Sequence, residues 1–134
     1  MPTLLIADDN VALRDTLVDI LQQEFTIVGI ASSGKEILER VPELRPDIVV
    51  LDISLGDSTG FDVLRKLKSD GFRCKFVFVS VHESPSFIQA AEELGASGYV
   101  FKSQISRDLL NTLQIVANEG PFSSSKHDTS SAGK

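Results

Sequence analysis

The sequence predicts an α/β fold, built as a five-stranded parallel sheet with helices on both faces. Five short apolar runs alternate along the chain with five longer segments in which apolar residues recur at helical spacing. This alternation favours parallel strands joined by right-handed helical crossovers. The third run, Ile48-Val49-Val50-Leu51, has no polar interruption, which is typical of a strand covered by helices on both sides.

The predicted strands are short and rich in β-branched or aromatic residues, which fit a pleated sheet. They cover residues 3–8, 25–30, 47–52, 76–80 and 98–101. Most of them end abruptly at a charged or hydroxyl residue. That pattern places the apolar part of each strand inside the domain and its last residue at the rim of the sheet.

Each predicted helix carries one apolar face. The helices cover residues 11–24, 35–44, 61–69, 84–94 and 106–118. Asp9 or Asn10 can cap the first helix, Ser33 can cap the second, and Pro85 suits the first turn of the fourth. The residues that end the last four helices are Arg45-Pro46, Gly71, Gly95 and Gly120-Pro121.

The composition predicts one domain over residues 1–120. The Ser-rich segment 121–134 is expected to be a flexible tail or the start of an interdomain linker. The formal net charge is -6, so we expect no direct nucleic-acid binding by this segment. A lone cysteine, Cys74, and the lack of a signal-like or membrane-length apolar run favour the cytoplasm, with no membrane partner.

Polar side chains follow four of the predicted strands: Asp8-Asp9, Asp52, Ser80 and Lys102. Because parallel strands end at one edge of a sheet, these groups are expected to lie together. Crowded carboxylates raise one another's pKa, and a bound Mg²⁺ relieves the repulsion. A carboxylate nucleophile, a cation, a lysine and a hydroxyl are suited to handling a phosphoryl group. Each group alone also has a structural explanation, as a helix cap, a surface charge or a strand-end hydroxyl.

With these motifs the sequence resembles the receiver domain of bacterial two-component response regulators over residues 3–118. The matching residues are Asp8-Asp9, Val49-Val50-Leu51-Asp52, Ser80 and Phe101-Lys102. The resemblance implies a flavodoxin-like (βα)5 fold with strand order 2-1-3-4-5 and a phosphoacceptor at Asp52. It also implies a Mg²⁺ site, with Mn²⁺ as the alternative ion. The ligands it implies are Asp8, Asp9, Asp52 and the backbone carbonyl of Ser54.

The same resemblance assigns roles to the remaining residues of the site. Ser80 would bind a phosphoryl oxygen, and Lys102 would pair with the phosphoryl group. Tyr99 matches an aromatic switch that turns inward in the active state. Ser54 and His82 would flank the phosphoryl group and tune how fast it is hydrolysed.

Three positions depart from the family pattern. Gly56 stands where the family usually has proline, so the loop after Asp52 is expected to be looser. Val81 replaces a small residue and is expected to narrow access for the phosphoryl group. Ser103 replaces the frequent proline after the lysine, which bears only on the shape of that loop.

Two segments, Leu51–Leu55 and Gly98–Ser103, resemble the NarL/FixJ branch, whose receivers precede a LuxR-type helix-turn-helix. The expected function is therefore a phosphorylation-controlled switch with a sensor histidine kinase as partner. Its output would be a DNA-binding domain absent from this chain, and a homodimer formed on phosphorylation is one option. Such a domain is a phosphoacceptor that assists its own phosphorylation and dephosphorylation, without independent substrate turnover.

Three other functions compete with the switch. An aspartate-nucleophile phosphatase would carry an Asp-x-Asp pattern after the first strand and a cap insertion, and this sequence has neither. A flavin-binding module would need a Ser/Thr/Gly-rich phosphate loop where the chain has Asp8-Asp9-Asn10. A receiver-like docking module that works without phosphorylation stays open, because Gly56 and Val81 depart from the family pattern.

Overall fold

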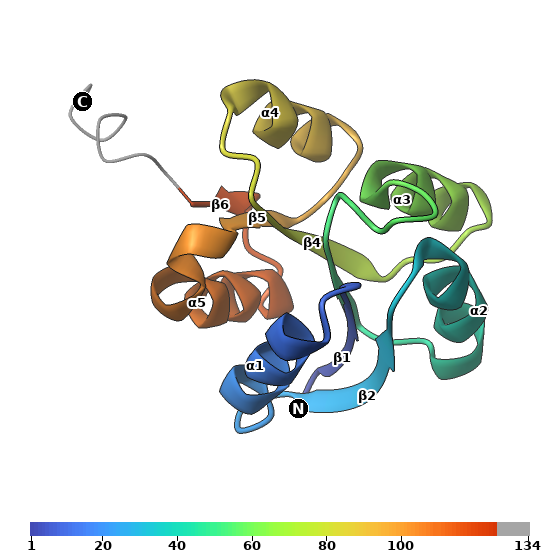
Figure 1. The fold of residues 1–134 in the computed structure, drawn as a ribbon, viewed down its shortest axis with the longest axis horizontal. Helices are drawn as coiled ribbons and strands as arrows, with labels where there is room; N and C mark the ends of the chain where they lie inside the picture. Colours follow the sequence, from blue (N-terminus) through green and yellow to red (C-terminus); the bar gives the residue numbers. More distant parts are fainter. Residues whose placement is uncertain (126–134) are drawn as a thin grey trace.

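The computed structural model describes residues 1–125, in which six strands alternate with five α-helices (Figure 1). The strands are β1 (Thr3–Ala7), β2 (Thr26–Ala31), β3 (Ile48–Leu51), β4 (Lys75–Ser80), β5 (Gly98–Phe101) and β6 (Ser123–Ser124). The helices are α1 (Val11–Leu21), α2 (Gly34–Leu44), α3 (Gly60–Ser69), α4 (Pro85–Glu93) and α5 (Ile105–Ala117), with a short 3₁₀ helix η1 (Lys102–Gln104) before α5. None of these helices is both long and apolar enough to cross a membrane.

All strand pairs of the sheet are parallel, and the strand order is β2-β1-β3-β4-β5-β6. The predicted order 2-1-3-4-5 is confirmed for the first five strands. The predicted number of five strands is wrong, because a sixth strand of two residues pairs with β5. Its serine-rich sequence has no apolar period, so the strand could not be recognised from side-chain pattern.

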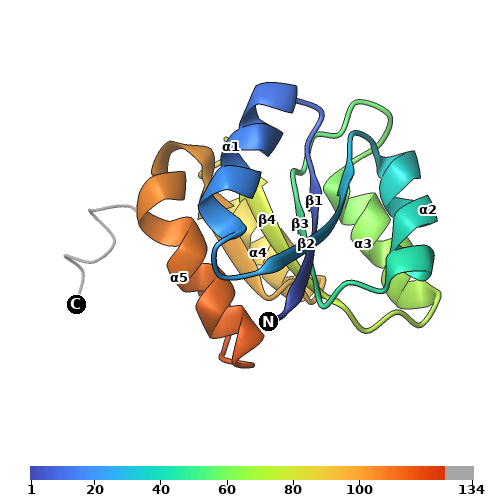
Figure 2. The ribbon, with the colours of Figure 1, turned by 90° about the horizontal axis from the view of Figure 1, so that it is seen from below.

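Helices cover both faces of the sheet, with α1 and α5 on one side and α2 and α3 on the other (Figure 2). The residues of β3 alternate between the two resulting cores. Val49 and Leu51 pack in the core that α2, α3 and α4 share, whereas Ile48 and Val50 pack in the core under α1 and α5. All four are at most 1% exposed, so the predicted strand with two buried faces is confirmed.

The helix ends follow local chemistry. The Asn10 side chain accepts a hydrogen bond from the Leu13 N–H at 3.0 Å, and the Ser33 hydroxyl accepts one from the Glu36 N–H at 3.1 Å. These side chains satisfy N–H groups that a first helical turn leaves without a partner. Helix α2 continues through Pro42 and ends at Leu44, and the capping residue Arg45 has a left-handed conformation with φ 47°. The last α-helix begins at Ile105, just after η1.

Ser125 fastens the segment after α5 to the edge of β5. Its N–H donates to the Tyr99 carbonyl at 2.8 Å. Its hydroxyl donates to Asp108 Oδ2 at 2.7 Å and accepts from the Phe101 N–H at 3.1 Å. Ser125 is 3% exposed. The segment predicted as a tail from residue 121 thus begins with residues bonded to the sheet, and residues 126–134 lie outside the described part.

Replacing Ser125 with alanine tests this attachment. The two hydrogen bonds of the buried hydroxyl are lost, so we expect the free energy of unfolding to fall by about 1–2 kcal/mol. Urea denaturation of Ser125→Ala and of the control Ser124→Ala measures the difference. Equal stability of the two variants would show that the Ser125 hydroxyl does not hold this segment.

Candidate functional site

Four of the predicted site residues, Asp8, Asp52, Ser80 and Lys102, lie at the carboxyl edge of the sheet because four neighbouring strands end there. Asp8 follows β1 and Asp52 follows β3, and these two strands pair with Ala7 opposite Leu51. Ser80 is the last residue of β4, and Lys102 follows β5 directly. The parallel register therefore places Asp8 and Asp52 side by side, as the sequence predicted.

Lys102 bridges the two buried carboxylates. Its Nζ lies 2.7 Å from Asp52 Oδ2 and 3.2 Å from Asp8 Oδ2. The second oxygen of each carboxylate accepts a backbone hydrogen bond, from the Asn10 N–H to Asp8 at 2.8 Å and from the Ser54 N–H to Asp52 at 3.3 Å. The Asp8 and Asp52 side chains are 1% and 8% exposed. Both carboxylates are therefore held at each oxygen.

Burial dominates the electrostatics of Asp8. It raises the pKa of this carboxyl, and the Asn10 N–H and the Lys102 ammonium offset the effect only in part, while the Asp52 charge adds to it. Burial disfavours the charged form of Lys102, but its hydrogen bond to Asp52 and the charges of Asp52 and Asp8 outweigh this and raise its pKa. The lysine therefore stays an ammonium, and the ionised form of Asp8 remains disfavoured by its burial.

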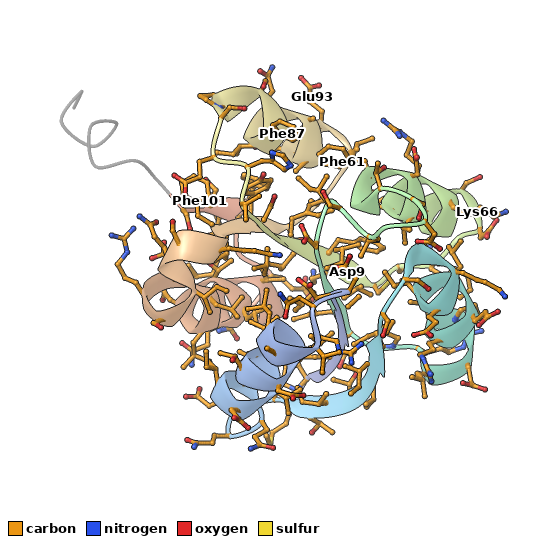
Figure 3. All side chains as sticks on the ribbon, in the orientation of Figure 1. Asp9, Phe61, Lys66, Phe87, Glu93 and Phe101 are labelled. Atoms are coloured by element: carbon orange, nitrogen blue, oxygen red, sulfur yellow. The ribbon has the colours of Figure 1, made fainter. Side chains whose placement is uncertain are left out.

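Asp9, the third predicted metal ligand, lies outside this ion pair. It is exposed, follows β1, and lies near the centre of the view in Figure 3. Its Oδ2 would be 3.9 Å from a Cβ added at Gly56, so it borders the loop after β3. Within residues 1–125, no three His, Cys, Asp or Glu side chains gather closely enough to hold a metal ion. The acceptor-only oxygens of Asp8 and Asp52 nevertheless fit the donor chemistry of Mg²⁺.

The predicted switch residues are connected through the backbone of His82. The Ser80 hydroxyl accepts from the His82 N–H at 3.1 Å, and the Tyr99 hydroxyl donates to the His82 carbonyl at 2.7 Å. Tyr99 is fully buried, so its side chain lies inside the domain; its role as a switch stays a prediction. Burial also raises the pKa of its hydroxyl, which keeps it a donor.

The His82 ring faces α4. It stacks on Phe87, with ring centroids 4.2 Å apart and planes 8° from parallel. Phe87 in turn stacks on Phe61 at 6.5 Å, between α3 and α4 (Figure 3). Val81 is 65% exposed, so its side chain faces solvent. This exposure does not support the expectation that Val81 narrows the access of a phosphoryl group to Asp52.

Two polar contacts near the site were not anticipated from the sequence. The Ser103 hydroxyl donates to Glu83 Oε2 at 2.8 Å and joins η1 to the loop that follows β4. Asp57, in the loop after Asp52, accepts two backbone hydrogen bonds from the start of α2. Both pairs lie far apart in sequence and have no local signature.

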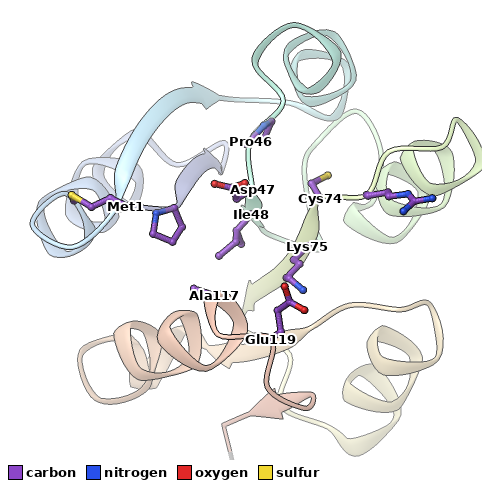
Figure 4. Close-up of a pocket in the computed structure, with 10 residues that line it drawn as sticks. Met1, Pro46, Asp47, Ile48, Cys74, Lys75, Ala117 and Glu119 are labelled. Carbon is purple, nitrogen blue, oxygen red and sulfur yellow. The ribbon is translucent and has the colours of Figure 1, made fainter.

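A separate hollow of about 510 Å³ lies at the opposite edge of the sheet, where β3 and β4 begin (Figure 4). Asp47, Lys75 and Glu119 are among the residues that line it. The Asp47 carboxylate already accepts from the Thr3 N–H at 2.8 Å and the Thr3 hydroxyl at 3.1 Å. This hollow is therefore no part of the Asp52 site.

The fold and the edge residues define a receiver domain. Residues 4–114 match the response regulator receiver domain family, and the chain belongs to that family. It is 31% identical over 117 residues to the nitrate/nitrite response regulator protein NarL of Escherichia coli, covering 86% of this chain and 54% of NarL. It is 34% identical over 118 residues to the DNA-binding transcriptional activator DevR/DosR of Mycobacterium tuberculosis, covering 87% of this chain and 54% of that relative.

A solved structure shows the same fold. The two-component response regulator of the LuxR family from Aurantimonas sp. SI85-9A1 is 22% identical and superposes with a TM-score of 0.88, covering 98% of this chain and 94% of that chain. The predicted receiver domain and its relation to NarL-type regulators are confirmed. The chain spans about half the length of the relatives NarL and DevR/DosR.

Replacing Asp8 with asparagine tests the electrostatics of the ion pair. The raised pKa means that ionisation of Asp8 opposes folding, so Asp8→Asn should raise the free energy of unfolding of the metal-free protein at pH 7. The gain is complete above the raised folded pKa and shrinks as the pH falls through it, where wild-type Asp8 takes up its own proton.

Denaturation at several pH values in the presence of a chelator measures this effect. Asp9→Asn is the matched control, because Asp9 is the neighbouring carboxylate but is exposed. It should change stability by less than about 0.5 kcal/mol. An Asp8→Asn variant less stable than wild type at every pH would contradict this account.

Proposed function

We propose that the chain accepts a phosphoryl group on Asp52 from a sensor histidine kinase in a Mg²⁺-dependent reaction and thereby switches a protein-binding face. The observation that carries the proposal is the Lys102 ammonium between Asp52 and Asp8 at the edge of the sheet. A nucleophilic carboxylate beside a fixed cation is suited to receive a phosphoryl group.

In the proposed transfer, an Asp52 oxygen attacks the phosphorus of the kinase phosphohistidine. The new O–P bond forms as the P–N bond breaks, and the histidine nitrogen keeps the electron pair. Lys102 contacts Asp52 Oδ2 at 2.7 Å and is placed to follow the negative charge onto the phosphoryl oxygens. The backbone N–H of Ser54 orients the other Asp52 oxygen.

The proposed ligands of Mg²⁺, or of Mn²⁺ in its place, are Asp8, Asp9, Asp52 and the Ser54 carbonyl. The buried, oxygen-only pair of Asp8 and Asp52 supports this assignment, as does the raised pKa of Asp8. The exposed Asp9 would have to turn toward the pair. When bound, the ion would supply positive charge against the phosphoryl oxygens.

The proposed switch begins at Ser80. Its hydroxyl would leave the His82 N–H for a phosphoryl oxygen, and His82 carries this change to Tyr99, which bonds the His82 carbonyl. Ser54 and His82 are proposed to flank the phosphoryl group and to tune its hydrolysis. The stacked His82 ring would act there only after leaving Phe87.

The output is proposed from the family. NarL is a response regulator and DevR/DosR a DNA-binding activator, so we place this domain in a cytoplasmic regulator of transcription. Homodimerisation on phosphorylation is part of the proposal. With a net charge of -6, the domain is expected to act on DNA only through an output domain, and no independent substrate turnover is expected.

A phosphorylation-independent docking module is the second candidate. Two observations favour it: Lys102 occupies both carboxylates, and no third acidic side chain joins them within residues 1–125. In that case Lys102 would serve as a permanent structural counterion for Asp8 and Asp52, and the site would bind neither Mg²⁺ nor a phosphoryl analogue.

Beryllofluoride and acetyl phosphate with Mg²⁺ separate the two candidates. We expect wild type to bind beryllofluoride and to take up one phosphoryl group per chain from acetyl phosphate. Asp52→Asn should lose both, because it lacks the nucleophilic carboxylate, whereas the control Asp70→Asn, at an exposed acid after α3, should keep them. No binding by wild type, or uptake that persists in Asp52→Asn, would overturn the phosphoacceptor proposal.

A further inference from the structure

The loop between Asp52 and α3 is attached to the start of α2 by one side chain. Asp57 Oδ1 accepts from the Gly34 N–H at 2.8 Å, and Oδ2 accepts from the Lys35 N–H at 3.0 Å. These are the first two N–H groups of α2. They lower the pKa of the Asp57 carboxyl, so it stays charged at neutral pH.

The residue before α2, Ser33, caps only some of the N–H groups at the start of this helix, and Asp57 binds the others. The Ser33 hydroxyl accepts from the Glu36 N–H, and the Ser33 carbonyl accepts from the Ile37 N–H. The N–H groups of Gly34 and Lys35 are the two that Asp57 serves. A helix N-terminus favours a negative charge, so one carboxylate from a distant loop completes this cap.

The loop also fits closely against α2. A Cβ added at Gly34 would collide with the Ser58 hydroxyl and lie 3.3 Å from Asp57 Oδ1, so the side chains of the loop would have to shift. Gly56 turns the chain just before Asp57 with φ +84°, a conformation that favours glycine. The glycine that replaces the usual proline therefore permits the turn that brings Asp57 to α2.

The first residues of the loop between Asp52 and α3 alternate between buried and exposed. Ile53 and Leu55 are 4% and 1% exposed, and the Gly60 N–H donates to the Ile53 carbonyl at 2.6 Å. Ser54 and Gly56 are exposed; Ser54 lies next to Asp52, and Gly56 lies next to Asp9. Ser54 forms an isolated antiparallel bridge with Thr59, the residue that caps α3, and the Asp57 carboxylate attaches the loop to α2.

We infer that Asp57 is a positioning residue. It holds the loop between Asp52 and α3 against α2 and thereby fixes the Ser54 backbone beside Asp52. Asp57 touches neither Asp52 nor Asp8 through any described hydrogen bond and acts only through the loop. Its effect on the metal site rests on the proposed function, because the Ser54 carbonyl is a ligand only in that proposal.

The test compares the clamp with an ordinary helix cap. Asp57→Ala removes both hydrogen bonds, Asp57→Asn can keep the one to Gly34, and Gly34→Ala pushes the loop away from the side of α2. Ser33→Ala is the matched control, because it removes a cap from the same helix end without touching the loop. Amide hydrogen exchange in the metal-free protein and Mg²⁺ affinity are measured for all four.

We expect Asp57→Ala and Gly34→Ala to speed amide exchange of Leu55 and Gly60. Mg²⁺ binding should weaken about tenfold, because residues that hold metal ligands in place typically contribute at least this much to metal affinity. Asp57→Asn should fall between wild type and Asp57→Ala. Ser33→Ala should leave the exchange of the loop and the Mg²⁺ affinity at wild-type values. The melting temperature of each variant shows how much general destabilisation accompanies the change.

Loop exchange and Mg²⁺ affinity in Asp57→Ala equal to those of Ser33→Ala would overturn the inference and leave Asp57 a cap alone. Failure of wild type to bind Mg²⁺ would instead overturn the proposed function. The exchange comparison would then still decide whether Asp57 holds the loop, because it needs no metal. A change in Mg²⁺ affinity without faster loop exchange would also contradict the clamp.

Discussion

The contact of the Lys102 ammonium with Asp52 and Asp8 is the interaction on which the carboxyl edge of this domain depends. Two carboxylates buried side by side repel each other and lose hydration, and the raised pKa of Asp8 reports that cost. Lys102 offsets it only in part. The ionised form of Asp8 therefore remains disfavoured in the folded domain, and this is the property on which the proposed Mg²⁺ site rests.

The fold supplies the geometry that makes this contact possible. The pairing of β1 with β3 brings the two carboxylates together, and Lys102 reaches them from the end of β5, two strands beyond β3. The same strand bears Tyr99, and its outer edge pairs with β6. Strand β5 is thus linked to three features: the carboxylates through Lys102, the His82 backbone through Tyr99, and the segment after α5 through its pairing with β6.

The parts of this structure that follow local pattern could be read from the sequence. The buried alternation of β3, the caps at Asn10 and Ser33 and the polar residues at the strand ends are of this kind. Strand β6 and the Asp57 clamp are not, because backbone pairing and a hydrogen bond across 23 residues leave no local signature. The His82 ring was expected near the phosphoryl group, but its stacking on Phe87 depends on where α4 packs.

The stability of Lys102→Met with and without Mg²⁺ tests the central claim most directly. In chelator at pH 8, we expect the free energy of unfolding to fall by about 3 kcal/mol, because two buried carboxylates lose their shared cation. Saturating Mg²⁺ should then stabilise this variant more than wild type, because the ion replaces the missing charge. Equal stability of Lys102→Met and wild type in chelator would contradict the account.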